Sequence, residues 1–245
     1  MKNTVIIIPA RLEATRFPNK PLAKINNIPM ILHVLNKAKQ SKVGEVFVAT
    51  PDKKIFDIVK NNGGVAVLTK QNHLSGSDRV YEAYSEKIKD NVDLIINLQG
   101  DMPNINPNNI AKLAKLMKDS NSDIGTLASP IKDEREFTDS NVVKVQVDQA
   151  LKDDSFLEAK DFFRKKKDLI NDKIYHHLGL YIFTKDALTR YVKLSRSKLE
   201  IERNLEQMRA MENNMIIKAG LTYSMPLSVD TEEDFKKVKN EMEKK

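Results

Sequence analysis

The sequence predicts an α/β protein whose first half is a doubly wound domain with a parallel sheet. Short apolar runs alternate with segments of helical periodicity up to about residue 130, which is the pattern of βαβ units. The first run is continuous and rich in β-branched residues, as in a strand buried on both faces. A chain of 245 residues is long enough for one such domain with a small excursion.

The elements follow in order from the N-terminus. Apolar residues recur at helical spacing between Ile31 and Ala38, which predicts the first helix. The second helix is expected to stop at Gly63 and Gly64, and the fourth to begin near Pro107. The predicted strands are residues 4–8, 45–50, 65–68 and 93–98, and the predicted helices are residues 30–40, 53–64, 77–88 and 106–120.

Composition excludes several classes of function. The net charge of +7 suits an anionic small molecule as well as nucleic acid. Much of the excess sits in residues 162–168 and in the lysine-rich tail, which are typical of solvated helix faces, so no nucleic acid is expected. The absence of cysteine excludes disulfides and thiolate metal sites. The apolar run at 5–8 is too short for a signal peptide or a membrane span, so we expect a cytoplasmic protein with no membrane partner.

The loop after the first strand carries three cations, Arg11, Arg16 and Lys20. Ligands of doubly wound sheets bind at the carboxyl ends of the strands, where this loop begins. Arginine and lysine match phosphate oxygens, and three of them would neutralise much of a triphosphate. The alternative is three solvated charges on a polar loop. Pro18 and Pro21 stiffen the loop, which favours the ligand.

Two carboxylates are candidates for a metal site. Asp101 directly follows the fourth strand, and Mg²⁺ is typically held by one or two carboxylates together with phosphates. Asp230, in the stretch 227–235, is the best second carboxylate. The alternative is that Asp230, or Thr231 with Asp234, caps the last helix; the spacing favours a cap, and the two roles are compatible.

The polar stretch 73–79, "HLSGSDR", follows the third strand. Gly76 permits close backbone approach, and the helix start beside it suits a base or ribose. Ser75, Ser77 or Asp78 would alternatively cap the helix. The sequence contains neither a Walker-type GxxxxGK[ST] nor a GxGxxG motif, and no catalytic triad is indicated.

Seven motifs taken together resemble the 3-deoxy-manno-octulosonate (Kdo) cytidylyltransferases, the CMP-Kdo synthetases. The resemblance implies a Rossmann-like nucleotidyltransferase fold with a mainly parallel central sheet. It implies a single domain over residues 1–245, a homodimer, and a sugar-binding and dimerisation excursion at about 130–215. The motifs are "IIIPARLEATRFPNKPL", "VAT", "HLSGSDR", "NLQGD", "HHLGLYIF", "LEIERNLEQMRAME" and "SVDTEED".

The resemblance also implies the reaction, in which CTP and Kdo give CMP-Kdo and pyrophosphate with Mg²⁺, for lipopolysaccharide synthesis. It assigns catalysis to Arg11, Arg16, Lys20 and Asp101, and the metal to Asp101 and Asp230. The nucleotide contacts would be Ala10, Arg11, Lys20, Ser75, Gly76 and Arg79. The sugar pocket would hold Arg16, Gln99, His177, Tyr181, Glu206 and Gln207.

The residues of the sugar pocket have a simpler interpretation on sequence alone. His177 lies in a predicted strand, where a histidine is more often a core group than a ligand. Glu206 and Gln207 are expected on an amphipathic helix, facing solvent or a subunit interface. The apolar stripe of that helix would include Ile201, Leu205, Met208 and Met211.

Three positions depart from the family pattern. Ala14 and Asn19 stand where the family usually has serine and glycine, although asparagine tolerates a left-handed backbone. Met102 replaces the glutamate of "QGDEP". Residues 153–177 replace a "YFSR…IP" stretch whose arginine faces the sugar acid, and Arg164 is the candidate substitute. The exact sugar therefore stays open.

We expect the anomeric hydroxyl of the sugar acid to attack the α-phosphorus of CTP in line, with Mg²⁺ on Asp101 and Asp230 positioning the α-phosphate. Arg16 and Lys20 would stabilise the departing pyrophosphate. One alternative is a related acid sugar such as 8-amino-Kdo. A second is a sugar-transferring enzyme, but "GDMPN" lacks the D-x-D pattern. A third is a nucleotide-binding protein without catalysis.

Overall fold

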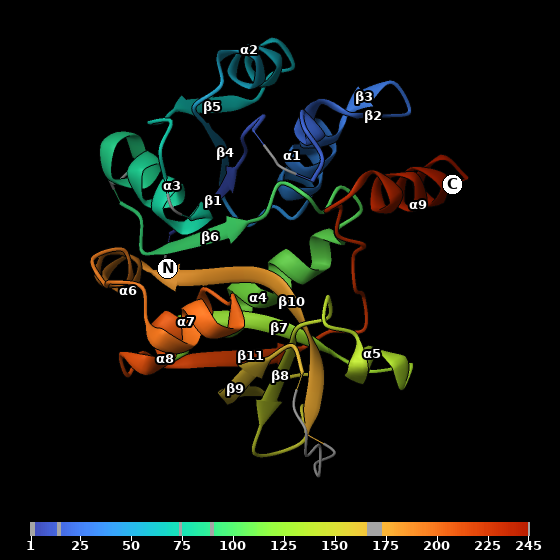
Figure 1. The fold of residues 1–245 in the computed structure, drawn as a ribbon. Helices are drawn as coiled ribbons and strands as arrows, with labels where there is room; N and C mark the ends of the chain where they lie inside the picture. The colour runs from blue at the N-terminus through green and yellow to red at the C-terminus, as the bar shows by residue number, and fades with distance from the viewer. Residues whose placement is uncertain (1–2, 14–15, 74, 89–90, 166–172, 245) are drawn as a thin grey trace. The chain divides into compact units, whose positions relative to one another are not determined.

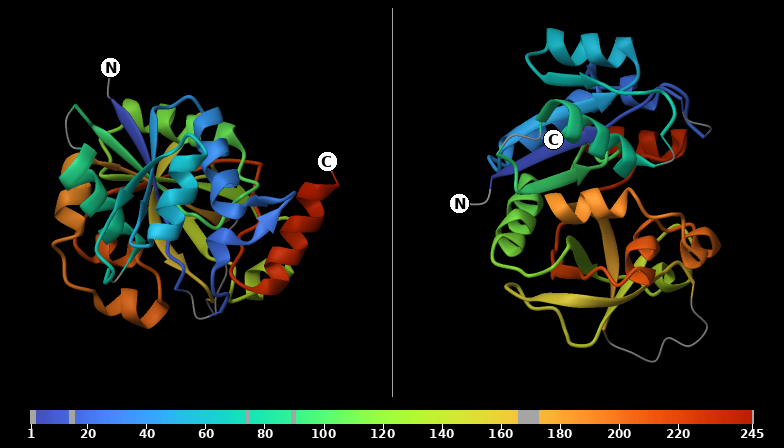
Figure 2. Two further views of the ribbon diagram at one scale, coloured as in Figure 1. Left: turned by 90° about the horizontal axis from the view of Figure 1, so that it is seen from above. Right: turned by 90° about the vertical axis from the view of Figure 1, so that its left-hand side faces the viewer.

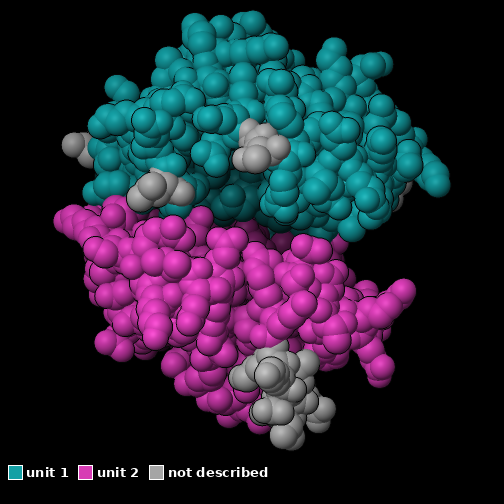
Figure 3. Space-filling model, viewed as in Figure 1, with its two compact units in different colours: residues 1–111, 226–245 teal, residues 112–225 magenta. Residues whose placement is uncertain are grey.

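A computed structural model describes residues 3–13, 16–73, 75–88, 91–165 and 173–244. The chain divides into two compact units, which Figure 3 distinguishes by colour. Unit 1 comprises residues 1–111 and 226–245, and unit 2 comprises residues 112–225. Unit 1 therefore contains segments from both ends of the chain.

Unit 1 holds a four-stranded parallel sheet (Figure 1), and its strands lie where the sequence predicts them. The strand order β5-β4-β1-β6 is third, second, first and fourth along the chain. This is the order of a doubly wound half, and it reverses between β1 and β6, where such folds bind ligands. Ile6, Ile7 and Ile8 of β1 are completely buried. The strands are β1 (Thr4–Pro9), β4 (Glu45–Thr50), β5 (Val65–Leu68) and β6 (Leu94–Leu98).

The helices of the first half also agree with prediction. After α2 the chain turns at Gly63, whose φ of 70° is one that glycine adopts readily. The predicted helix 77–88 is α-helical only in its first part and continues as a π-helical turn, η2. The elements are α1 (Met30–Gln40), α2 (Lys53–Asn61), α3 (Gly76–Ala83), η2 (Tyr84–Ile88) and α4 (Pro107–Lys118).

The C-terminal segment packs against the beginning of the chain within unit 1. Ile25, Met30, Val229 and Val238 form one buried apolar cluster. The Phe17 and Phe235 rings lie beside that cluster, 5.5 Å apart. This packing joins the N-terminal hairpin to the last helix. The elements involved are η1 (Lys20–Leu22), β2 (Lys24–Ile25), β3 (Ile28–Pro29) and α9 (Glu232–Glu243).

The described residues of unit 2 form five strands in the order β10-β7-β11-β9-β8, and β8 also pairs with β10. Among these strands β7 and β11 pair in parallel, and the other pairs are antiparallel. The prediction of a mainly parallel central sheet is therefore wrong, and the described sheet is mixed. Parallel neighbours require a crossover connection, usually a helix, and no helix lies between β8 and β10 in the residues that the structure describes. The strands are β7 (Ile124–Pro130), β8 (Lys144–Val147), β9 (Phe156–Phe163), β10 (Ile174–Thr184) and β11 (Ile217–Leu221).

The helices of unit 2 are short, and Figure 2 shows α4 and the α7–α8 pair on opposite sides of the strands. The prediction of one amphipathic helix through Glu206 and Gln207 is wrong. Asn204 has a left-handed backbone, with φ at 52°, which ends α7 before α8 begins. Ile201 is consequently 60% exposed instead of lying on the buried stripe. The helices are α5 (Arg135–Thr138), α6 (Lys185–Tyr191), α7 (Lys198–Arg203) and α8 (Gln207–Glu212).

Among the described residues, no helix combines the length and the apolar character that crossing a membrane requires.

Candidate active site

Four charged residues predicted for one site come together in unit 1. The Lys20 ammonium lies 3.6 Å from Asp101 Oδ2 and 3.8 Å from Asp230 Oδ1, and donates to the Val229 carbonyl at 2.7 Å. Arg16 Nη2 lies 3.2 Å from Asp230 Oδ1. Arg11 is exposed on the same loop. The group lies where β1 and β6 end, which is the edge expected to bind ligand.

The backbone explains how Asp230 reaches this site. The Val229 amide donates to the Asp101 carbonyl at 2.9 Å, and the Leu227 amide donates to Asn104 Oδ1 at 3.1 Å. These bonds attach the C-terminal segment to the loop that follows β6. Asp230 is therefore fixed by contacts far away in sequence.

Of the two capping alternatives for this segment, the one with Thr231 and Asp234 is confirmed. Thr231 Oγ1 accepts from the Asp234 amide, and the Asp234 carboxylate accepts from the Thr231 amide, which completes a capping box. The carboxylate of Asp230 is therefore left to pair with Lys20 and Arg16.

The pKa of Asp101 is shifted by burial and by two neighbouring charges. Burial raises the pKa of Asp101 above its ordinary value; the Lys20 ammonium opposes this, and the Asp230 carboxylate adds to it. Within the described residues no cluster of three or more His, Asp or Glu side chains is arranged to hold a metal ion. Asp101 and Asp230 each lie beside Lys20, and their carboxylates are hard oxygen donors of the kind that suit a divalent cation.

Asn19 stands where the family usually has glycine, and it adopts the left-handed backbone that asparagine is expected to tolerate. Its φ is 57°, in the left-handed region, and its amide donates to the Leu12 carbonyl at 3.0 Å. Asparagine adopts this conformation at a lower cost than most residues. Asparagine at position 19 therefore suits the turn that precedes Lys20.

We expect Asn19→Val to destabilise the protein by about 1–2 kcal/mol, because a β-branched residue is strained in this conformation. Asn19→Gly is the matched control and should leave stability within about 0.5 kcal/mol of the wild type. Urea unfolding of the three proteins measures the effect. Equal stability of the valine and glycine variants would contradict it.

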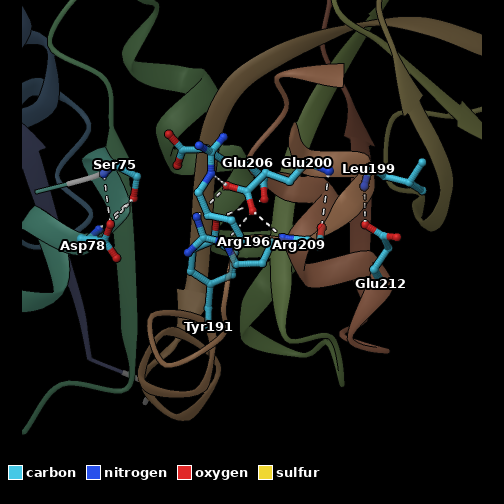
Figure 4. Close-up of polar contacts among 10 residues, drawn as sticks. Ser75, Asp78, Tyr191, Arg196, Leu199, Glu200, Glu206, Arg209 and Glu212 are labelled. Carbon is cyan, nitrogen blue, oxygen red and sulfur yellow. Dashed lines mark hydrogen bonds and ion pairs between the residues drawn. The ribbon is translucent and has the colours of Figure 1, made fainter. Parts of the chain in front are cut away.

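The stretch predicted to contact the nucleoside begins α3. Ser75 and Asp78 form a capping box, with the Asp78 amide 3.2 Å from Ser75 Oγ, so the capping alternative for this pair is confirmed (Figure 4). A Cβ atom at Gly76 would lie 3.5 Å from Pro9 Cγ and 3.6 Å from Gln99 Oε1. The start of α3 thus lies against the ends of β1 and β6.

Arg79 is buried, and its guanidinium holds the loop after β5. It donates to Thr69 Oγ1 at 2.5 Å and to the Lys70 carbonyl at 2.9 Å. Burial lowers the pKa of Arg79, and the charge of Arg11 adds to this. Any contact of Arg79 with a nucleoside stays a prediction.

Gln99 is held by Asn97, which the sequence did not single out, and Asn97 is held in turn by Ser77, which the sequence offered only as a helix cap. Its Nε2 donates to Asn97 Oδ1 at 2.9 Å, and Asn97 Nδ2 donates to Ser77 Oγ at 3.3 Å. The available signal was Asn97 itself, a polar residue inside the apolar strand "LIINL", because a buried amide requires partners. This chain of bonds fixes how the Gln99 amide is turned.

Two residues assigned to the sugar pocket come together in unit 2. The rings of His177 and Tyr181 are 5.4 Å apart, although residues four apart in a regular strand are separated by about 13 Å. A bulge in β10 between Leu178 and Tyr181 accounts for this proximity, since bulges re-aim side chains.

His177 also fits the interpretation as a satisfied core histidine. It is 7% exposed, and its Nε2 lies 2.9 Å from Thr126 Oγ1. Carbonyls of Leu178 and Leu180 lie 3.0 and 2.9 Å from the same hydroxyl. The hydroxyl has one proton, which it donates to a carbonyl, so His177 Nε2–H is assigned as the donor to Thr126.

The pKa values of this pair move in opposite directions. Burial lowers the pKa of His177 to about 3, and the charge of His176 adds to this. Burial raises the pKa of Tyr181 well above its ordinary value, and the Glu206 carboxylate adds to that shift. His177 and Tyr181 are therefore both uncharged at neutral pH.

The free energy of unfolding should fall as the pH drops from 6.5 towards 3. Unfolded His177 regains its ordinary pKa near 6.5 and binds a proton that the folded protein excludes down to about pH 3. The stabilisation is complete above pH 6.5, and about 2 kcal/mol of it should be lost at pH 5. Urea unfolding of wild type and His177→Gln at pH 7.5 and 5.0 measures this loss, and an equal pH dependence of the two proteins would contradict it.

Glu206 and Gln207 lie at the start of α8, where a buried ion pair anchors the helix (Figure 4). Arg209 donates to both carboxylate oxygens of Glu200, at 2.8 and 2.6 Å. Its guanidinium lies over the Tyr191 ring, 4.8 Å from the centroid, and the Tyr191 hydroxyl donates to the Glu206 carbonyl at 3.1 Å. Gln207 is buried, which corrects the expectation that it faces solvent or an interface.

The segment that departs from the family pattern is described in part. Arg164 Nη1 donates to the Ser140 carbonyl at 3.0 Å, so the candidate substitute for the arginine facing the sugar acid is engaged with a neighbouring loop. Of the other positions that depart from the family pattern, some lie in the described residues and some do not. Met102 is buried, whereas Ala14 and residues 166–172 lie outside the described residues.

Comparison with known proteins gives concordant results. The family model for cytidylyltransferases matches residues 5–218. The 3-deoxy-manno-octulosonate cytidylyltransferase of Brucella anthropi is 43% identical over 232 residues, covering 94% of this chain and 93% of that protein. The enzyme of the same name from Brucella ovis is 42% identical, covering 94% and 92%.

A solved structure of a CMP:2-keto-3-deoxy-manno-octonic acid synthetase complexed with CTP superimposes with a TM-score of 0.90. It is 33% identical, and the match covers 99% of each chain. A cytidylyltransferase from Leptospira borgpetersenii has a TM-score of 0.62 at 20% identity, covering 98% of this chain and 86% of that one. The more distant match supports the α/β nucleotidyltransferase fold alone.

Proposed function

The chain belongs to the 3-deoxy-manno-octulosonate cytidylyltransferase family, and we propose on this premise that it converts CTP and Kdo into CMP-Kdo and pyrophosphate. The observation that carries the proposal is the convergence of Arg16, Lys20, Asp101 and Asp230 where β1 and β6 end. CMP-Kdo would supply lipopolysaccharide synthesis.

The cations of the first loop bind the triphosphate in this proposal. Arg11 is exposed, and Lys20 and Arg16 hold partners that an incoming phosphate can replace. Charge-assisted bonds from these groups neutralise the phosphate oxygens. They also stabilise the negative charge that gathers on pyrophosphate as it leaves. Ala10, Ser75, Gly76 and Arg79 contribute the remaining nucleotide site.

Binding of the triphosphate creates the requirement for a metal. Once Lys20 and Arg16 pair with phosphate, the carboxylates of Asp101 and Asp230 lose their counter-charges and face further anions. Two carboxylates plus phosphate oxygens are a donor set that fits Mg²⁺. Bound there, Mg²⁺ would supply neutralising charge beside the α-phosphate and favour ionisation of the attacking hydroxyl.

The sugar acid reacts through its anomeric hydroxyl. This oxygen gives up its proton to solvent and forms a bond to the α-phosphorus, and the bond from the α-phosphorus to the oxygen bridging to the β-phosphate breaks, so pyrophosphate leaves. We assign the sugar contacts to Arg16, Gln99, His177, Tyr181, Glu206 and Gln207. Neutral His177 and Tyr181 can exchange hydrogen bonds with sugar hydroxyls, and the Glu206 carboxylate accepts them.

A related acid sugar, such as 8-amino-Kdo, is the second candidate substrate. The observation that motivates it is the segment 153–177, which departs from the family's sugar-facing stretch and whose Arg164 donates to the Ser140 carbonyl. We also propose a homodimer, with residues 130–215 forming a sugar-binding and dimerisation excursion within one domain. Light scattering after size exclusion tests the dimer.

Pyrophosphate release tests the function directly. Purified protein is supplied with CTP, Kdo and Mg²⁺, and each is omitted in turn. Release that needs all three supports the proposal. Release with 8-amino-Kdo but not with Kdo would move the assignment to the second candidate, and CTP binding without release on either sugar would overturn both.

A further inference from the structure

Asp52 occupies the N-cap of α2 but does not cap it. An aspartate at this position normally accepts a hydrogen bond from an amide in the first helical turn. The side chains of Ser75, Thr184, Ser197 and Thr231 do so for their own helices. Asp52 makes no such bond, although its backbone is extended as at the other caps. A local rule that fails in this way often indicates a functional position.

The carboxylate of Asp52 instead reaches the loop after β1. Its Oδ2 accepts from the Leu12 amide at 2.8 Å, forty positions earlier in the chain. Leu12 directly follows Arg11, and its carbonyl accepts from the Asn19 amide, directly before Lys20. The peptide groups of Leu12 therefore connect Asp52 to the backbone beside both cations.

The charges around Asp52 favour the same role. The charge of Asp52 acts on the buried Arg79, as do those of Arg11 and Glu82. Besides burial, the positive charge of Arg11 on the loop after β1 lowers the pKa of Arg79 on α3, and the negative charge of Asp52 opposes that shift.

We infer that Asp52 is a positioning residue for the nucleotide site, holding the Leu12 amide so that Arg11 and Lys20 are spaced to receive a triphosphate. The role of the two cations rests on the proposed function, whereas the attachment of Leu12 to Asp52 does not. The side chain acts through the loop backbone and need not touch the substrate.

Three variants separate anchoring from capping. Asp52→Ser keeps a good N-cap residue but is too short to reach Leu12. Asp52→Asn keeps both an N-cap residue and an oxygen acceptor at the same distance. Asp52→Ala keeps neither. Calorimetry gives the Kd for CTP, turnover gives kcat and KM for each substrate, and thermal unfolding gives Tm.

If Asp52 positions the loop, serine and alanine should each raise the Kd and KM for CTP about tenfold or more. The KM for the sugar should stay within about twofold, and asparagine should recover most of the affinity. Thr184→Ala removes a genuine cap in unit 2 and is the control: it should lower Tm without changing the Kd for CTP. Wild-type affinity in Asp52→Ser would overturn the inference, as would equal losses in all three variants.

Hydrogen exchange provides a readout independent of substrate. The Leu12 and Asn19 amides should exchange at least about tenfold faster in Asp52→Ser than in wild type, without any ligand. Unchanged exchange would overturn the anchoring. Faster exchange in a protein whose wild-type form does not bind CTP would instead contradict the proposed function and leave the anchor standing.

Discussion

Asp101→Asn should lower kcat on the order of a thousandfold while leaving the fold intact. The substitution keeps the size of the side chain but removes its charge next to Lys20 and Asp230. The site then retains one carboxylate for a divalent cation, and the α-phosphate loses its positioning. Pyrophosphate release measures the effect, and far-ultraviolet circular dichroism with Tm verifies the fold.

Asp57→Asn is the matched control for that change. Asp57 is also an aspartate of unit 1, but it lies on α2 and pairs with Lys53 on the surface. Its loss should leave kcat within about twofold, because exposed ion pairs contribute little. Asp101→Asn with activity close to that of Asp57→Asn would remove Asp101 from the metal site.

Arg209→Ala should destabilise the protein by about 3–5 kcal/mol, because it leaves the Glu200 carboxylate buried without its main partner. The side chains of Arg209 and Glu200 are only 4% and 2% exposed. Burial acts to raise the pKa of Glu200, but hydrogen bonds from Arg209, Ser197 and Arg196, together with the charge of Arg209, outweigh it, and the pKa is lowered. Urea unfolding at pH 7 measures the loss.

Two further variants make this test specific. Arg196→Ala removes the exposed partner of Glu200 and should cost no more than about 1 kcal/mol. The double variant Glu200→Leu with Arg209→Met removes both buried charges and should recover much of the stability. A single Arg209→Ala variant as stable as Arg196→Ala would show that the pair does not hold α7 and α8.

The first half of the chain was largely predictable because its signals are local. Strand 45–50 and helix 30–40 match the structure to the residue, since helical spacing and β-branched runs act over a few residues. Unit 2 was less predictable. Its antiparallel pairings depend on contacts distant in sequence, and the break at Asn204 interrupts a stripe that reads as continuous.

The part of the candidate site that lies where two strands end was predictable, because the sheet topology indicates which loops lie together. The rule for doubly wound sheets brings the loops after β1 and β6 together, which accounts for Lys20 and Asp101. Asp52 was missed because its position before a helix indicates a cap, and nothing local distinguishes a cap from an anchor forty residues away. The inferred role of Asp52 rests on a tertiary contact, the hydrogen bond that it accepts from the Leu12 amide.

The bond from Lys20 to the Val229 carbonyl has a consequence for synthesis of the protein. The two residues are 209 positions apart. At ribosomal speeds of roughly 5–20 residues per second, Lys20 is added to the chain about 10–40 seconds before its acceptor. The strands of unit 1 can form in that interval, but its charged cluster cannot. Chains interrupted before Asp230 would therefore be nascent proteins with a folded sheet but without the full charged cluster proposed for catalysis.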